Sequence, residues 1–381
     1  MDSATSSRMA ELFLAGPRGR RFLLHYALIS EGAASPAQSE ALFSQATVQA
    51  ALRLDPHISD DPAVRSRARF GWVDSLPEVQ HVSAFEVAQR LGAVELLAPT
   101  PEMLRTALKA AVDTARYWQE PDGEDRLAAT PEMRHALQHV ARHVAASPHL
   151  AWWRAPVDRS TQHCVLWEGT PPWDIPEDIH ATIRAARDRE LAQEQLARTQ
   201  RDPDPAANWS GEWWSQPPKA IPSSTRTLFD GSPAGLWFVE DSLGWEQAQS
   251  TRLLVPDDVS VFEITQAADW AELCARFPLD VTAQKRHDWY RTTDRTGRWV
   301  IPDWAQVAQH YDGVHLHVAA YLSAAGTAIP VAHNTSTASV IAGWNPDETY
   351  WFSSDIVYDS ECTQWVFGNE ETNMVWTPTS T

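Results

Sequence analysis

Cysteine is scarce in this chain of 381 residues, which contains only Cys164, Cys274 and Cys362 and no CxxC pair. This excludes a disulfide-stapled fold and a thiolate zinc site, and it suits a reducing compartment. Long apolar runs are also missing, because no stretch approaches the roughly 20 residues that span a bilayer. At the N-terminus the basic residues follow a short apolar run, the reverse of the order in a signal peptide. We therefore expect a cytoplasmic protein with no membrane partner.

Basic residues are scarce as well. The chain has 31 Lys and Arg against 50 Asp and Glu, a net charge of −19, and no Lys or Arg follows Arg298. Such an acidic balance argues against a reader of duplex nucleic acid, which works by neutralising phosphates. The chain also lacks a GxGxxG motif, a P-loop and an HExxH motif. Nucleotide binding by a glycine cradle and zincin chemistry therefore have no support.

The remaining composition is that of a globular protein, with 43% hydrophobic residues. Tryptophan is abundant: the chain has 19, and 13 of them lie between Trp209 and Trp376. The charge is −6 up to residue 208 and −13 after it, and residues 201–208 form a proline-containing linker at this boundary. These shifts predict an all-helical domain at 1–150, connecting strands with a surface helix and linker at 151–208, and a Trp-rich acidic α+β domain at 209–381.

Helix start signals recur in the first half. Thr100 and Thr130 each precede Pro-Glu-Met, so that Thr caps the helix and proline takes its first position. Ser35-Pro36 opens another run with helical periodicity. A charged helix is expected over residues 176–199, lying on a domain surface.

The second half mixes strand and helix patterns. Aromatic and β-branched runs predict strands over 236–240, 258–264, 314–318, 339–342 and 349–352. Apolar residues at helical spacing predict helices over 269–277 and 302–311, and the short aromatic runs at 151–155 and 161–167 favour a small strand pair. The expected fold class is α+β: a helical N-terminal half followed by a mostly antiparallel β-sheet domain with a few helices.

His315 and His317 are the strongest metal signal. Residues two apart on a strand point to one face, so both imidazoles could hold one ion, with His310 or His333 as a third ligand. The alternative is a half-exposed strand face that carries two solvated histidines. Because no third ligand lies close in the sequence, we expect no metal here.

The tryptophans that lead into the second half are a second candidate. Trp209, Trp213 and Trp214 lie in a segment rich in Ser, Pro and Gly. Their flat rings could stack on a sugar, a nicotinamide or a base. The alternative is that they cover the domain as buried lid residues.

The order of features in the second half provides a third candidate. A polar segment, residues 223–229, includes Thr225 and Arg226. An aromatic segment with Trp237 follows over residues 235–248, and the acidic residue Glu348 lies about 100 residues further along the chain. This order resembles the ADP-ribosyltransferase-like superfamily. The resemblance covers only the second half, and the family's Ser-Thr-Ser has its only counterpart at 336–339, late in the chain.

The resemblance implies an ADP-ribosyltransferase-like enzyme that consumes NAD as its substrate. It implies that Thr225 and Arg226 contact NAD, that Trp237 flanks the nicotinamide, and that Glu348 is the catalytic residue facing the anomeric carbon. Glu370 and Glu371 are alternatives for that acidic role. A carboxylate there would stabilise the oxocarbenium-like centre that forms when nicotinamide departs.

Two other functions stay open. One is a non-catalytic interaction module whose acidic, aromatic surface captures a basic protein partner. The other is a metal-dependent enzyme that uses His315 and His317. A concave site would favour an enzyme that binds a small-molecule nucleotide, and a broad flat aromatic patch would favour the interaction module.

Overall fold

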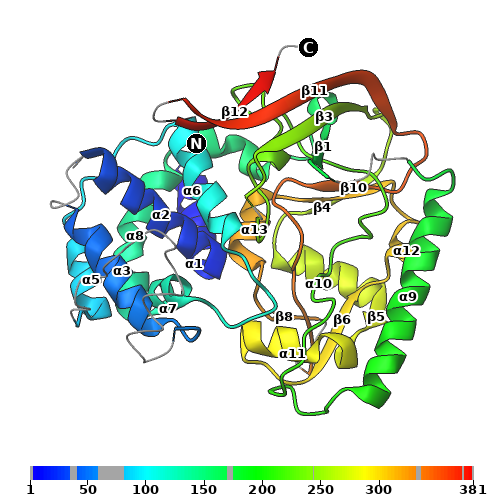
Figure 1. The fold of residues 1–381 in the computed structure, drawn as a ribbon, viewed down its shortest axis with the longest axis horizontal. Coiled ribbons are helices and arrows are strands. Elements are labelled where there is room, and N and C mark those ends of the chain that lie inside the picture. The colour runs from blue at the N-terminus through cyan, green and yellow to red at the C-terminus, as the bar shows by residue number, and fades with distance from the viewer. Residues whose placement is uncertain are drawn as a thin grey trace. The chain divides into compact units, whose positions relative to one another are not determined.

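The computed structural model describes residues 3–34, 41–58, 81–169, 175–242, 244–331, 336–370 and 373–379. The chain divides into two compact units, which we treat separately. Unit 1 comprises Met1–Ala111 and Gln119–Leu150, and unit 2 comprises Val112–Trp118 and Ala151–Thr381. Helices dominate the first half and mainly antiparallel sheets occupy the second, which confirms the α+β class (Figure 1). The predicted helix start at Ser35-Pro36 lies outside the described residues.

Unit 1 is built from helices with buried apolar faces. Both predicted threonine caps are present, because the Thr100 and Thr130 hydroxyls accept from the N–H of Met103 (3.2 Å) and Met133 (3.4 Å). Its helices are α1 (Ser3–Ala15), α2 (Pro17–Ala34), α3 (Leu42–Leu54), α5 (Ala84–Leu91), α6 (Pro101–Asp113), α7 (Gly123–Ala129) and α8 (Pro131–Ala145).

The described residues of unit 2 form three four-stranded sheets. The first has the order β1-β3-β11-β12, with β1 (His163–Trp167), β3 (Gln247–Leu254), β11 (Val357–Glu370) and β12 (Asn373–Thr379). The second has the order β2-β10-β7-β4, with β2 (Ser223–Ser224), β10 (Thr349–Trp351), β7 (Gly313–Leu316) and β4 (Val261–Ile264). The third has the order β5-β6-β9-β8, with β5 (Pro278–Asp280), β6 (Arg298–Pro302), β9 (Thr337–Ser339) and β8 (Ile329–Pro330). Most pairings are antiparallel, and β4–β7 and β6–β9 are parallel.

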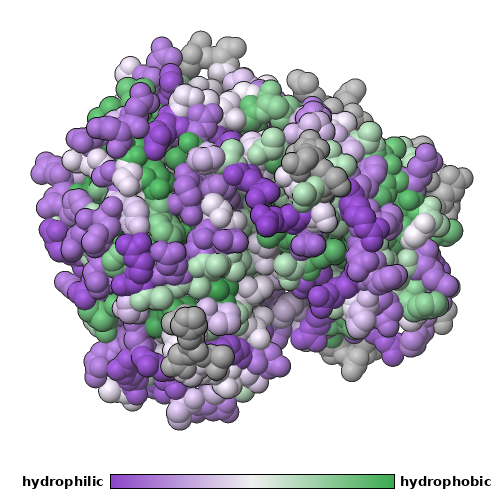
Figure 2. All heavy atoms as spheres, turned by 180° about the vertical axis from the view of Figure 1, so that it is seen from behind, coloured by the Kyte–Doolittle hydropathy of each residue, from purple (hydrophilic) through white to green (hydrophobic). Residues whose placement is uncertain are grey.

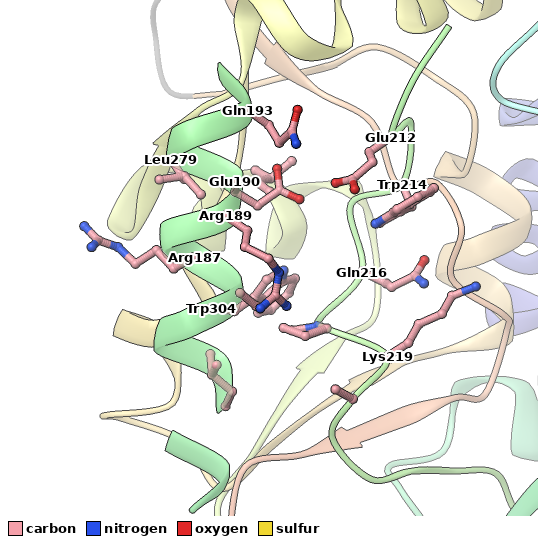
Figure 3. A pocket seen from close by; sticks show the side chains of 15 residues that line it. Arg187, Arg189, Glu190, Gln193, Glu212, Trp214, Gln216, Lys219, Leu279 and Trp304 are labelled. Carbon is pink, nitrogen blue, oxygen red and sulfur yellow. The ribbon is translucent and has the colours of Figure 1, made fainter. Parts of the chain in front are cut away.

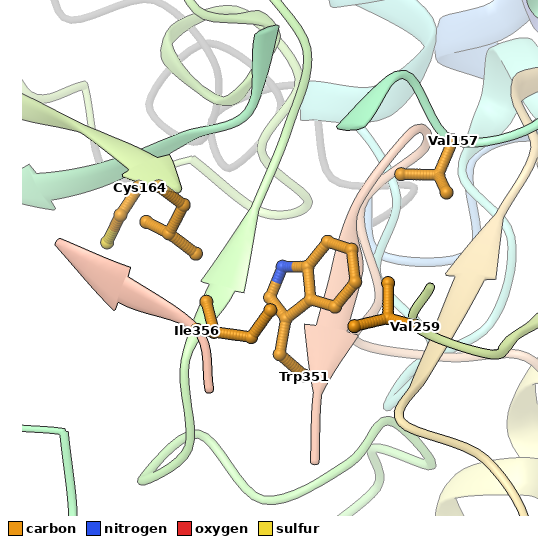
Figure 4. Close-up of a cluster of buried hydrophobic side chains, with 6 residues drawn as sticks. Val157, Cys164, Val259, Trp351 and Ile356 are labelled. Atoms are coloured by element: carbon orange, nitrogen blue, oxygen red, sulfur yellow. The ribbon is translucent and has the colours of Figure 1, made fainter. Parts of the chain in front are cut away.

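The helices of unit 2 are α9 (Ile179–Gln200), α10 (Ala267–Arg276), α11 (Thr282–Thr293), α12 (Trp304–Val307) and α13 (Val318–Ala324). Of these, α9 packs against α11 and α12 (Figure 1). A core cluster around Trp351 joins side chains from several strands and loops (Figure 4). Trp351 donates its indole N–H to the Ser224 hydroxyl at 2.7 Å, so the polar edge of this large buried ring is satisfied.

Several predicted elements differ from those observed. Residues 236–240 form no strand: the 3₁₀ turn η4 (Ala234–Leu236) ends at Leu236, and the aromatic residues Trp237 and Phe238 that follow it are buried. Residues 151–155 lie largely in the 3₁₀ helix η2 (Pro148–Arg154), and β1 pairs instead with β3. The helix expected over 302–311 is only one turn long, and the strand expected over 314–318 ends at Leu316, so His317 lies at the N-terminus of α13.

The segment 151–208 is integral to unit 2. It supplies β1 to the first sheet and α9 against α11 and α12. A fragment that begins at residue 209 would therefore lack a strand and a packed helix. Among the described residues, no helix combines the length and hydropathy needed to cross a bilayer. Hydrophilic residues cover much of the face shown in Figure 2, with apolar residues scattered among them.

Candidate active-site pocket

A cavity of about 350 Å³ lies between α9 and the segment 212–220. Leu279, Ile301 and Trp304 from the third sheet and α12 also line it. Figure 3 shows charged side chains of α9 on one side and Glu212, Trp214 and Gln216 on the other. Its volume is at the lower end of the range for small-molecule sites.

The position of α9 is set at both ends. Asp178 caps the helix by accepting the N–H of Ala181 at 2.7 Å. Near the other end, the buried Glu194 carboxylate accepts the N–H groups of Ala283 (3.1 Å) and Gln284 (2.8 Å), in the first turn of α11. A carboxylate there neutralises the positive end of α11, which ties the two helices together. Glu190 lies four residues before Glu194 and so shares its face of α9.

Lys285 of α11 supplies a cation beside the cavity. Its side chain is fully buried, its ammonium donates to the Glu212 carbonyl oxygen at 2.8 Å, and it lies 3.7 Å from the Glu190 carboxylate. Burial lowers the pKa of Lys285, an effect that the charges of Glu190 and Glu212 oppose. Lys285 therefore places its ammonium group next to the Glu190 carboxylate.

Glu190 and Glu212 form a carboxylate pair in the cavity. Figure 3 shows the two carboxylates pointing toward one another, and both residues line the cavity. Partial burial raises the pKa of Glu212, and the adjacent Glu190 raises it further, whereas Lys285 acts in the opposite direction. A carboxyl group with a raised pKa next to a second carboxylate is an arrangement that suits acid–base chemistry.

The cavity has aromatic walls and a cationic rim. Trp214 and Trp304 line it, and Trp304 is held by donating its indole N–H to the Ser215 carbonyl at 3.3 Å. Both polar atoms of the buried Gln216 amide have no hydrogen-bond partner in the part of the chain that the structure describes. Arg189 and Lys219 are exposed, and neither forms an ion pair with the described residues.

Gly343 fixes the packing of one wall. Its φ is +73°, and an added Cβ would lie 2.4 Å from Gln216 Oε1 and 2.5 Å from Trp214 Cβ. Only glycine adopts this backbone conformation without strain and leaves room for both side chains.

The residues proposed from the resemblance lie elsewhere in unit 2. Arg226 donates from Nε to Asp347 Oδ1 at 2.7 Å, its backbone N–H donates to Asp347 Oδ2 at 3.1 Å, and its guanidinium lies 5.0 Å from the Trp152 ring centroid. Thr225 accepts the N–H of Gly235 at 2.8 Å. Neither Thr225 nor Arg226 lines the cavity.

Trp237 and Glu348 are also buried. Trp237 donates its indole N–H to the Ser232 hydroxyl at 2.8 Å and packs against Phe367. Glu348 accepts from the Asn345 backbone and side-chain amides, and burial raises its pKa. The structure thus brings Arg226 to Asp347, the neighbour of Glu348 in sequence.

His315 and His317 do not lie on an exposed face. Both are buried, with ring centroids 4.9 Å apart, and both ring systems face Glu263 of the adjacent strand β4. The half-exposed strand face given as the alternative to a metal site is wrong, because every residue of β7 is buried. His310 packs against Phe277 instead, and His333 lies outside the described residues.

Sequence reasoning identified one wall of the cavity and missed its charged groups. Trp214 was named as a stacking residue, and it lines the cavity, where Trp213 packs against it at a 74° angle. Glu190, Glu212 and Lys285 were missed because they come from separate parts of the sequence. The sequence did contain one indication of these groups: Glu190 and Glu194 are four residues apart and share one face of the predicted helix, an arrangement that favours a basic partner.

No family model, curated protein or solved structure matches the chain in the three comparisons made. Inference about function therefore depends on the geometry of this pocket and of the histidine cluster.

Proposed function

We propose that unit 2 is an NAD-consuming enzyme that cleaves the bond between nicotinamide and ribose in this pocket and passes the ADP-ribosyl group to water or another acceptor. The observation that carries the proposal is the Glu190–Glu212 carboxylate pair with Lys285 beside it. The site differs from that implied by the superfamily resemblance, but the reaction is the same.

The pocket offers a role for each group. When the bond from the anomeric carbon to nicotinamide breaks, the electron pair leaves with the nicotinamide nitrogen and the ribose becomes oxocarbenium-like. The Glu190 carboxylate, next to Lys285, stabilises that positive charge. Glu212 has the raised pKa and accepts the proton of the attacking hydroxyl group as the new C–O bond forms.

The walls and rim fit the same ligand. Trp214 and Trp304 offer flat apolar surfaces for the nicotinamide ring and keep water from the reacting carbon. Arg189 and Lys219 supply positive charge at the rim, where a pyrophosphate would lie. Local cations matter because the whole chain carries −19 and would otherwise repel an anion.

The test is release of nicotinamide from NAD by the full chain, followed by chromatography. Glu190→Gln and Glu212→Gln should each lower turnover by about 10²–10⁴-fold, the usual contribution of one acid–base group. Glu272→Gln is the matched control, because Glu272 is exposed on α10 and forms a surface ion pair with Arg276 at 3.5 Å. Thermal unfolding of each variant shows whether it is folded.

Two results would contradict the proposal. One is a wild-type chain that neither releases nicotinamide nor gains thermal stability with NAD. The other is loss of turnover in Glu348→Gln with normal turnover in Glu190→Gln and Glu212→Gln. That outcome would place the reaction at the acid chosen from the sequence and remove the pocket from the mechanism.

A further inference from the structure

Three metal-ligating side chains converge beside the second sheet of unit 2. The parallel pairing of β4 with β7 sets Glu263 next to His315, and His317 follows at the N-terminus of α13. Glu263 Oε2 lies 2.7 Å from His315 Nδ1 and 2.8 Å from His317 Nε2. One ligand atom from each of the three residues lies within 4.8 Å of the others.

The residues that surround Glu263 and His315 also fit a metal site. The far nitrogen of His315, Nε2, faces Asp347 Oδ1 at 3.5 Å, and Asp347 is itself held by Arg226 at 2.7 Å. The second oxygen of Glu263 accepts the Val157 N–H at 3.0 Å. A carboxylate behind a ligating histidine orients its ring and fixes its tautomer, which is the usual surrounding of a histidine metal ligand.

His317 gives a second, independent indication. Its residue is only 3% exposed, and its Nδ1 has no hydrogen-bond partner within the described ranges. In the structure one carboxylate oxygen lies at hydrogen-bonding distance from both histidines. A metal ion between these three atoms would move the histidine protons to the far nitrogens, where Asp347 is ready to accept the one from His315.

We propose that Glu263, His315 and His317 form a three-ligand site for a divalent transition metal, with zinc as the preferred ion. Two imidazole nitrogens and one carboxylate oxygen suit zinc, at about 2.0–2.2 Å each, and leave a fourth position open. Glu263 Oε2 lies 2.7 and 2.8 Å from the two nitrogens and would need to move about half an ångström away from each to reach that geometry. Glu263 takes the place of His310 and His333 as the third ligand. We expected no metal because the sequence offered no third ligand nearby, and Glu263 supplies one.

The experiment uses the full chain, stripped with a chelator and titrated with Zn²⁺ by calorimetry and with Co²⁺ by visible absorption. We expect one ion per chain, a Co²⁺ spectrum of low coordination number and a rise in melting temperature with Zn²⁺. Glu263→Gln and His317→Ala should abolish the Co²⁺ spectrum. Asp347→Asn should weaken metal binding by about 10–100-fold, as loss of an outer carboxylate does.

His310→Ala is the matched control, because that histidine is exposed and contacts Phe277, and it should bind the metal normally. The proposal is overturned if wild type binds no stoichiometric ion, or if Glu263→Gln and His317→Ala bind Co²⁺ as wild type does. Should Glu263→Gln fail to fold, the wild-type stoichiometry and the His317→Ala spectrum still decide. Glu190→Gln should keep its metal, so failure of the NAD proposal leaves this result unaffected.

Discussion

Replacing Lys285 by methionine tests the electrostatics of the pocket. Methionine keeps the length of the side chain but removes a cation that is fully buried and 3.7 Å from Glu190. Removing one partner of a buried ion pair costs about 3–5 kcal/mol, because the other charge stays buried without compensation. Glu190 is 18% exposed and keeps some solvation, so we expect about 3 kcal/mol, at the lower end of that range.

The assay is urea unfolding followed by tryptophan fluorescence. Trp72 is the only tryptophan of the sequence within the bounds of unit 1, so fluorescence reports on unit 2 almost alone. With a slope of about 3 kcal/mol per M, typical of a larger unit, the urea midpoint should fall by about 1 M. Nicotinamide release should fall as well, because the carboxylate pair would lose the cation beside it.

A second substitution makes the reasoning falsifiable. Glu190→Gln removes the charge that Lys285→Met would leave uncompensated, so the double variant should regain at least about 1 kcal/mol relative to the sum of the single effects. If the single effects simply add, Lys285 stabilises unit 2 by packing alone. The explanation of the pocket's charge balance would then be wrong.

Two further predictions concern a histidine of unit 1 and a glycine of unit 2. Burial and the charge of Arg21 lower the pKa of His25 to about 3 from 6.5, so only the unfolded chain binds this proton as the pH falls below 6.5. At pH 5, 1.5 units below 6.5, this difference lowers the free energy of unfolding of unit 1 by about 2 kcal/mol, at 1.36 kcal/mol per pKa unit. The His25→Asn variant should not lose this stability between pH 7 and pH 5, as measured by urea unfolding followed by circular dichroism. Gly343→Ala should cost about 1–3 kcal/mol and weaken NAD binding, because its Cβ would displace Gln216 and Trp214; unchanged NAD affinity by calorimetry would contradict this.

Helices with local start signals were predictable from the sequence. The caps at Thr100 and Thr130 depend only on residues within one turn, and both form as expected. The helix expected over 176–199 is observed as Ile179–Gln200, because its cap, Asp178, lies beside the predicted start. Local chemistry decides such elements, and a single sequence contains it.

The candidate site was less predictable because its groups meet across long sequence separations. Arg226 was chosen as a lone cation, yet its partner Asp347 lies 121 residues away. The aromatic run at 236–240 indicated a strand, but aromatic residues also mark positions that are buried without pairing. Tertiary packing sets both outcomes, and neither periodicity nor composition reports it.

The buried charges of unit 2 themselves argue for function. Only nine Lys and Arg follow residue 208, and Arg226 and Lys285 are both buried against carboxylates. Apolar side chains of similar volume would stabilise such positions as well or better, so stability alone does not account for them. Lys285 lies behind a carboxylate pair that lines a cavity, and Arg226 holds the carboxylate behind His315. Each cation therefore holds a carboxylate that lines a cavity or lies behind a histidine cluster. Perturbed ionisable residues are most often found at functional sites of this kind.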